Sequence, residues 1–189
     1  MIAPSSRRTH APGQLPQTTT LPSATTPQFH AEMAGLWQDV VTGRARTAMP
    51  AFFPLDAYLQ LKSIPDAQGD WQSRLVGELS FDLAAAHALI GNGATTAQLV
   101  QVIVPTEHAH WVPPGVCYSS VGYSEAPKAR VVYQAKDVVR SSGIASTISW
   151  RGQCYVVHLG AVLRATTTGR GEVDAPATGA GTTAYSSTC

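Results

Sequence analysis

Residues 70–93 read DWQSRLVGELSFDLAAAHALIGNG, and this stretch predicts one long amphipathic helix. Asp70 is a suitable N-cap for a helix that begins at Trp71, and Gly91-Asn92-Gly93 ends it after Ile90. At 100° per residue, one face of this helix collects its apolar side chains, which are Trp71, Leu75, Leu79, Leu83, Ala86 and Ile90. Asp82 lies close to the centre of the same face. We therefore expect a carboxyl group where the helix packs on the rest of the protein.

A shorter amphipathic helix is predicted upstream, because apolar residues recur at helical spacing from Phe29 to Val41. Thr26 can cap this helix, Pro27 suits its first position and Thr42-Gly43 can end it.

The segment between the two helices predicts two short elements. Residues 44–52 are expected to form a short helix that stops near a proline. Residues 57–62 alternate at a period of two, which predicts a short strand with Tyr58 on one face.

After the long helix the pattern changes to strands rich in Val, Ile and Tyr. The predicted strands are residues 99–104, 115–123, 129–134, 138–149 and 153–164. The last two should form a hairpin around Arg151-Gly152, with Ser146 opposite Val157. One face of this hairpin is apolar and belongs on the core. The other face, with Thr147 and His158, is mixed and suits solvent or a partner subunit.

Composition sets the domain organisation and excludes two function classes. The chain has 189 residues, a net charge of +1, and 44% hydrophobic and 13% charged residues. This balance argues against a nucleic-acid binder, and no segment has the roughly 20 consecutive apolar residues of a membrane span. Residues 1–28 and 165–189 are rich in Thr, Pro, Ser or Gly and cannot bury enough apolar surface to offset their ordering entropy. We expect one α+β domain over residues 29–164, between two disordered tails.

Several short motifs resemble the ketosteroid-isomerase-like superfamily, also called SnoaL-like or nuclear transport factor two. LWQDVVTG (36–43), AFFP (51–54) and Ala57-Tyr58 resemble the opening of these proteins, and SWRGQCYVVH (149–158) resembles their final hairpin. The resemblance implies a cone-shaped fold, a cystatin-like roll in which N-terminal helices pack on a curved antiparallel sheet and enclose an apolar pocket. It also implies that the convex face can form a homodimer. The superfamily contains isomerases, dehydratases, polyketide cyclases and non-catalytic modules, so the fold leaves the function open.

Asp82 is the one candidate catalytic residue. Burial disfavours its charged form, and Glu78 one turn away adds like-charge repulsion. Such a carboxyl can act as a general base, with Tyr58 or Tyr118 as hydrogen-bond donor; the alternative is a structural Asp held by Arg, Tyr or backbone amides. The candidate pocket residues are Tyr58, Asp82, Trp111 and Tyr118, although each tyrosine can equally serve in packing.

No cofactor or metal is expected. Glu107-His108-Ala109-His110 puts two histidines two residues apart, but a zinc site needs three or four convergent ligands. Trp111 follows these residues and is expected to lie at the rim of the pocket.

The three cysteines bear on the compartment in which the protein resides. In a reducing cytosol Cys117, Cys154 and Cys189 would stay thiols, whereas outside the cell Cys189 can form a disulfide with Cys117. Thr/Pro-rich ends are common in envelope and secreted proteins, but the N-terminus lacks the pattern of a signal peptide. We favour an extracytoplasmic or cell-envelope location, with the cytoplasm as the alternative.

These features predict a non-catalytic binding or interaction module whose apolar pocket holds a small hydrophobic ligand or engages a protein partner. Only Asp82 points firmly inward, whereas acid–base catalysis usually needs a second positioned group. The alternative is an isomerase, dehydratase or cyclase that uses Asp82 as base. Dimerisation through the mixed hairpin face is compatible with either function.

Overall fold

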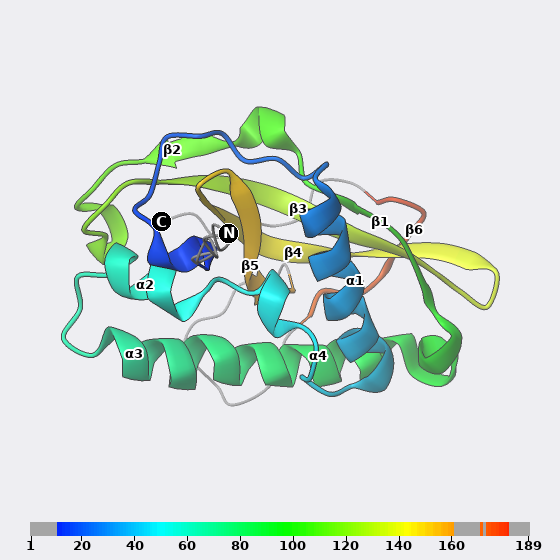
Figure 1. Cartoon of the computed structure of the whole chain (residues 1–189). Coiled ribbons are helices and arrows are strands. Elements are labelled where there is room, and N and C mark those ends of the chain that lie inside the picture. Colours follow the sequence, from blue (N-terminus) through cyan, green and yellow to red (C-terminus); the bar gives the residue numbers. More distant parts are fainter. Residues whose placement is uncertain (1–10, 161–170, 172, 182–189) are drawn as a thin grey trace, which may run out of the picture.

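The structure, a computed structural model, describes residues 11–160, 171 and 173–181. It is an α+β fold in which helices pack on an antiparallel sheet of six strands that is not closed (Figure 1). The helical elements are α1 (Pro27–Thr42), α2 (Leu55–Leu61), α3 (Ala67–Asp70), a π-helical segment (Trp71–Val76) and α4 (Gly77–Ile90). The strands are β1 (Gln98–Ile103), β2 (His110–Val112), β3 (Tyr123–Ala135), β4 (Val138–Trp150), β5 (Gln153–Leu159) and β6 (Ala177–Thr178).

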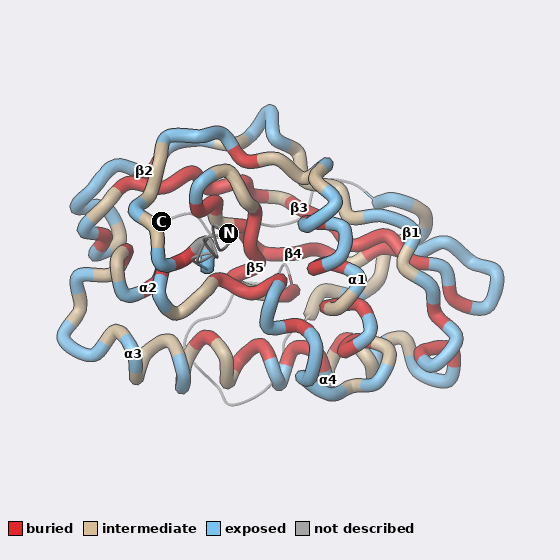
Figure 2. Tube along the Cα trace, in the orientation of Figure 1, coloured by how far each residue is buried: buried red, intermediate tan, exposed pale blue. Residues whose placement is uncertain are grey.

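The sheet is built around the long β3–β4 pair. Its main order is β1-β3-β4-β5, while β2 also pairs with β3 and β6 with β4. In Figure 1 the rod formed by α3, the π-helical segment and α4 runs along the bottom of the view, and α1 extends from the sheet down to α4. Buried residues concentrate in β3, β4 and β5 and on the inner sides of α1 and α4 (Figure 2). The core therefore lies between the helices and one face of the sheet.

Helix α1 is confirmed with its predicted caps. The Thr26 side chain accepts a hydrogen bond from Phe29 N, Pro27 occupies the first position, and Gly43 ends the helix with a positive φ of 65°. A left-handed φ is strained for residues with a Cβ, which explains a glycine at this position.

The predicted helix over residues 44–52 is wrong except for its last turn, a 3-10 helix at Met49–Ala51. The preceding residues form a loop that is held by Asp39, a buried residue of α1. Asp39 Oδ2 accepts hydrogen bonds from the backbone N–H groups of Arg46 (2.6 Å), Thr47 (2.7 Å) and Ala48 (2.7 Å). These bonds replace the intrahelical bonds that a helix would provide.

The strand predicted over residues 57–62 is wrong, because this segment is helix α2. Its buried residues Ala57, Tyr58 and Leu61 follow helical spacing, and the short alternating pattern fits both structures. The helix begins directly after Pro54, which has extended backbone angles.

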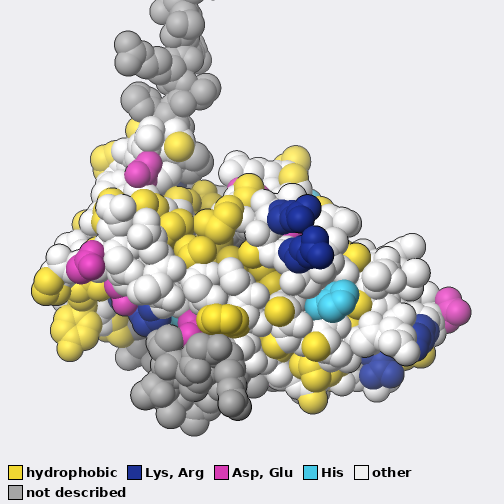
Figure 3. Space-filling model, turned by 90° about the horizontal axis from the view of Figure 1, so that it is seen from below, with side chains coloured by type: hydrophobic (Ala, Val, Ile, Leu, Met, Phe, Trp, Pro, Cys, Tyr) yellow, Lys and Arg dark blue, Asp and Glu magenta, His cyan; other side chains and the backbone are white. Residues whose placement is uncertain are grey.

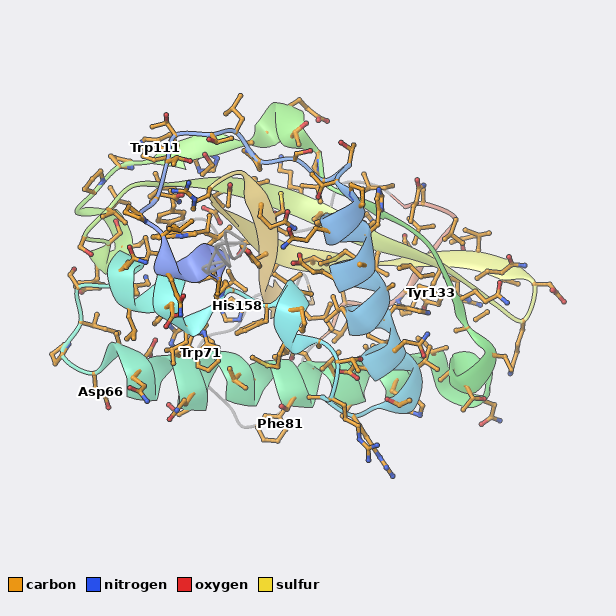
Figure 4. The ribbon with its side chains drawn as sticks, in the orientation of Figure 1. Asp66, Trp71, Phe81, Trp111, Tyr133 and His158 are labelled. Atoms are coloured by element: carbon orange, nitrogen blue, oxygen red, sulfur yellow. The ribbon has the colours of Figure 1, made fainter. Side chains whose placement is uncertain are left out.

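The long helix is confirmed but begins earlier than predicted. Asp66, rather than Asp70, is the N-cap and accepts a hydrogen bond from Gly69 N at 2.8 Å. The predicted apolar face is buried at Leu75, Leu79 and Leu83. On the opposite side of α4, Phe81 is 45% exposed and points away from the sheet (Figure 4). Figure 3 views the molecule from this side. It shows hydrophobic side chains among backbone and uncharged polar groups, with few charged side chains, in keeping with the low charge of the chain.

The strand predicted over residues 115–123 is also wrong. This segment is a loop with a 3-10 turn at Val116–Tyr118, and the neighbouring strand is β2, in the region that we expected to be a loop. Cys117 and Tyr118 both have left-handed backbone angles, with φ values of 53° and 55°. Such angles are incompatible with a continuous strand.

The β4–β5 hairpin turns at Arg151-Gly152 as predicted, but a register irregularity places Ser146 opposite His158 instead of Val157. Most described residues of its mixed face are buried within one chain, with Thr147 1% exposed. The expectation of a solvent-facing or partner-facing surface there is therefore corrected, and only His158 of these residues is partly exposed.

Parts of both predicted tails follow defined paths. Trp150 Nε1 donates to Leu15 O at 3.1 Å, and Ser23 N donates to Gly152 O at 3.0 Å, so residues 15–23 run along the hairpin tip. Near the other end, the Asp174 carboxylate accepts from Gly143 N, and β6 pairs with β4. Residues 1–10, 161–170, 172 and 182–189 lie outside the described part of the chain. Polar segments with little apolar area are held here by hydrogen bonds, which composition alone does not reveal.

The loop after α1 provides a first test. In an Asp39→Asn variant a neutral amide oxygen replaces the charged acceptor of three backbone N–H groups, and the NH₂ group replaces the oxygen that accepts from the Thr47 hydroxyl. We expect the free energy of unfolding, measured with urea, to fall by about 1–3 kcal/mol. The exposed neighbour Gln38→Ala should change it by no more than about 0.5 kcal/mol. Equal stability of the two variants would contradict this role of Asp39.

Candidate functional site

A cavity of about 190 Å³ opens between the helices and the sheet. Its helical wall is formed by α2 and the π-helical segment, and its sheet wall by β3, β4 and β5. The lining residues from the helical side are Phe53, Tyr58, Leu61, Lys62, Arg74 and Leu75, and those from the sheet are Tyr123, Glu125, Ser146, Ile148, Val157 and His158. The cavity therefore combines apolar walls with several ionisable groups, as ligand sites usually do.

Tyr58, Asp70 and Arg74 form a hydrogen-bonded network on the helical wall. Arg74 pairs with Asp70 through two bonds, Nε to Oδ1 at 2.8 Å and Nη2 to Oδ2 at 2.7 Å. The Tyr58 hydroxyl donates to Asp70 and accepts from Arg74 Nη2 at 3.0 Å. The hydrogen bond from Arg74 is the main reason that the pKa of Asp70 lies below its ordinary value. Burial is the main reason that the pKa of Tyr58 is raised.

The π-helical segment positions the cavity residues of the long helix. Both Arg74 and its neighbour Leu75 line the cavity, where they add a guanidinium and an apolar side chain to the same wall. Trp71 anchors the start of the segment, because its Nε1 donates to Phe53 O at 2.8 Å; Figure 4 shows Trp71 above the long helix. Single π-helical turns within α-helices occur frequently at functional sites.

Lys62 follows α2 and brings a half-buried ammonium group to the cavity. Its Nζ donates to Cys117 O at 2.7 Å. The loop that carries Cys117 is held against the end of α2, since Ser63 N donates to Tyr118 O at 2.8 Å and Ser120 N donates to Leu61 O at 2.7 Å. Burial lowers the pKa of Lys62, and the charge of Arg74 lowers it further.

Glu125 brings a buried carboxyl group to the sheet wall, with only 4% of its surface exposed. It lies in β3, directly opposite His110 of β2, and its Oε2 is 3.7 Å from His110 Nε2. Within the described part of the chain, Oε2 has no hydrogen-bond partner. Burial raises the pKa of Glu125, while the charge of His110 partly offsets the rise.

Two other titratable side chains share the sheet wall with Glu125. Tyr123 lies two residues earlier on the same strand, and burial, followed by the charge of Glu125, raises its pKa to about 12. His158 comes from β5 and lies between the sheet and the long helix (Figure 4).

The structure brings only one of the four predicted pocket residues to this cavity. Tyr58 lines it, whereas Asp82 is fully buried on α4 and is not among the described lining residues. Trp111 is 42% exposed and its indole ring lies close to Gly122, and Tyr118 is 74% exposed. Neither of these exposed aromatic side chains lines the cavity.

Sequence reasoning missed Glu125, Lys62 and Arg74. Lys62 ends the strand predicted over residues 57–62, and residues 124–128 lie between the strands predicted over 115–123 and 129–134. The available signal was a Tyr and a Glu at positions 123 and 125, which share one face of any strand that includes both.

The cysteines differ in their surroundings. Cys154 is a free thiol with no exposed surface, and burial raises its pKa to about 12. Cys117 takes part in a disulfide. Cys189 lies outside the described residues, so its pairing with Cys117 stays a prediction.

The described ranges hold neither a metal-ligand cluster nor a membrane-spanning helix. There, no group of three or more His, Cys, Asp or Glu side chains is arranged to hold a metal ion. None of the described helices is long and apolar enough to cross a membrane. No protein-family model, curated protein or solved structure matches this chain.

The Asp70–Arg74 pair generates a prediction on stability. Asp70→Asn should lower the free energy of unfolding at pH 7 by about 1–2 kcal/mol, because a charged hydrogen bond is lost from a partly exposed site. Since the pKa of Asp70 is lowered on folding, its stabilisation is present above the unfolded pKa of about 3.8 and is lost as the pH falls further. Urea unfolding between pH 7 and pH 3 measures this. Asp56→Asn, exposed on α2, is the control; a deficit that grew on acidification would contradict the ion pair.

The raised pKa of Glu125 predicts that its contribution to the free energy of unfolding changes with pH in the direction opposite to that of Asp70. Its pKa is raised on folding from 4.5, so the folded state binds more protons just above pH 4.5, and wild-type stability falls as the pH rises through the raised pKa. A Glu125→Gln variant does not titrate and should gain stability relative to wild type from pH 4.5 to pH 7. Urea unfolding should be repeated with His110→Gln present in both proteins, because the charge of His110 acts on the neighbouring Glu125 carboxyl. A gap that is independent of pH would refute the shift.

Proposed function

We propose that this protein is a small-molecule-binding module whose ligand occupies the cavity between α2, the π-helical segment and the sheet. The ligand has a compact apolar body and one carboxylate or carbonyl oxygen. The apolar part of the proposal is supported by the walls, where Leu61, Leu75, Ile148 and Val157 line the cavity. Its volume of about 190 Å³ favours a ligand no larger than a small ring with one or two substituents.

Lys62 is the reason for proposing that the ligand bears an anionic or carbonyl group. It is a half-buried cation, and within the described residues no carboxylate lies within ion-pair distance of its Nζ. Cys117 O accepts only one of the three hydrogen bonds that an ammonium group can donate. Arg74 differs, because its charge is matched by Asp70. A ligand oxyanion beside Lys62 would therefore compensate a charge that burial has partly stripped of water.

The order of the elements supports a proposal on the family. Two helices, a long helix and then an antiparallel meander, with the helices on one face of the sheet, agree with membership of the ketosteroid-isomerase-like superfamily and its cone-shaped fold. An extracytoplasmic location is supported by the disulfide at Cys117, because disulfides persist mainly outside the reducing cytosol.

A second candidate function is an acid–base enzyme of the isomerase, dehydratase or cyclase type. One observation favours it: a carboxyl group with a raised pKa, Glu125, lines the cavity. Glu125 would then take the role of base that we assigned to Asp82, and Tyr58 or Tyr123 could donate a hydrogen bond.

Titration with small carboxylates tests the binding function. Amide chemical shifts of the full ¹⁵N-labelled chain should be followed with benzoate, phenylacetate and butyrate, and with alcohols and amines of matched carbon skeleton. We expect at least one carboxylate to shift the amides of cavity residues and to bind roughly tenfold tighter than its alcohol. Lys62→Met keeps the apolar stem of the side chain but should abolish that preference.

Lys136→Met, at the exposed β3–β4 turn, is the matched control and should retain the preference. The proposal fails if no carboxylate shifts the cavity residues, if the amines bind tighter than the carboxylates, or if Lys62→Met and Lys136→Met behave alike.

A further inference from the structure

We propose that Glu125 determines the ligand specificity of this cavity by selecting molecules that carry a hydroxyl group in addition to the oxyanion held at Lys62. The ligands would thus be small hydroxycarboxylic acids with a compact apolar body. This inference rests on the proposed binding function and deepens it.

The first observation is an acceptor that lacks a donor. Glu125 lines the cavity with only 4% of its surface exposed, and its Oε2 has no hydrogen-bond partner in the described part of the chain. His110 Nε2 is 3.7 Å away, beyond hydrogen-bond distance. Leaving a buried acceptor unsatisfied costs free energy, and a ligand that donates to Oε2 would recover it.

The second observation is that the two polar ends lie on different walls. Lys62 follows helix α2, whereas Glu125 lies in β3 between His110 of β2 and Ile148 of β4. Leu75 and Val157 contribute apolar surface to the same cavity. A ligand that satisfies both ends therefore needs two polar groups joined by an apolar body.

Charge favours a hydroxyl group at the Glu125 end. A second anionic group would be repelled by an ionised Glu125, and an ammonium group would compete with the neighbouring His110 when that imidazole is protonated. A hydroxyl group both donates and accepts, so it can pair with the ionised and with the protonated carboxyl. Tyr123 and His158 line the same cavity and add a phenol and an imidazole to its sheet wall.

Calorimetric titration of the full chain with four probes tests this specificity. The probes are benzoate, 3-hydroxybenzoate, 4-hydroxybenzoate and 4-(aminomethyl)benzoate. We expect one of the hydroxybenzoates to bind wild type at least about tenfold tighter than benzoate does, which corresponds to one well-formed hydrogen bond. Glu125→Met should lose this gain, read as the ratio of hydroxybenzoate affinity to benzoate affinity within the same variant.

Two further variants keep the result interpretable. Glu107→Gln, exposed near β2, is the matched control and should keep the full gain. Glu125→Gln retains an acceptor oxygen and should keep part of it, which also covers the case in which Glu125→Met does not fold.

The outcomes separate the two proposals. If benzoate binds but no hydroxyl group adds affinity, or if the gain survives in Glu125→Met, the specificity of Glu125 is refuted and the binding function stands. A larger gain for the aminomethyl probe also refutes it, in favour of a cationic group. If none of the four probes binds wild type, both proposals fail.

Discussion

The Asp70–Arg74 ion pair, shared with the Tyr58 hydroxyl, is the contact on which the site depends. It joins α2 to the start of the long helix, the two elements that together form the helical wall of the cavity. The charges of Asp70 and Arg74 match each other, so the Arg74 guanidinium adds no net charge to this wall. Its loss would let α2 move relative to the helix, and Lys62, which follows α2 directly, would move with it.

The cavity has two unequal polar ends. At the helical end, Lys62 is held by a neutral carbonyl of the loop that contains Cys117. At the sheet end, Glu125 is buried beside a histidine that is too distant for a hydrogen bond. Both groups are less solvated than in water and incompletely paired within the described chain, which is unfavourable for an empty site and favourable for one that holds a complementary ligand.

Local patterns explain which elements could be predicted. Helix α1 has strong caps at Thr26 and Gly43, and the long helix repeats its apolar residues over several turns, so both were identified correctly. The six residues from 57 to 62 are too few to separate a period of two from one of 3.6, and α2 was mistaken for a strand. In the site, Tyr58 is among the predicted pocket residues, whereas Glu125 lies in residues 124–128, between two predicted strands that the structure joins into β3.

The sequence by itself determined the α+β class, the two main helices, the β4–β5 turn and the burial of Asp82, because each follows from the spacing of apolar residues within one short segment. Only the tertiary structure decided that Asp82 does not line the cavity and that Glu125 shares it with Lys62. These residues belong to segments far apart in the chain, and the environment of a side chain depends on all the elements that pack around it, which no local pattern records.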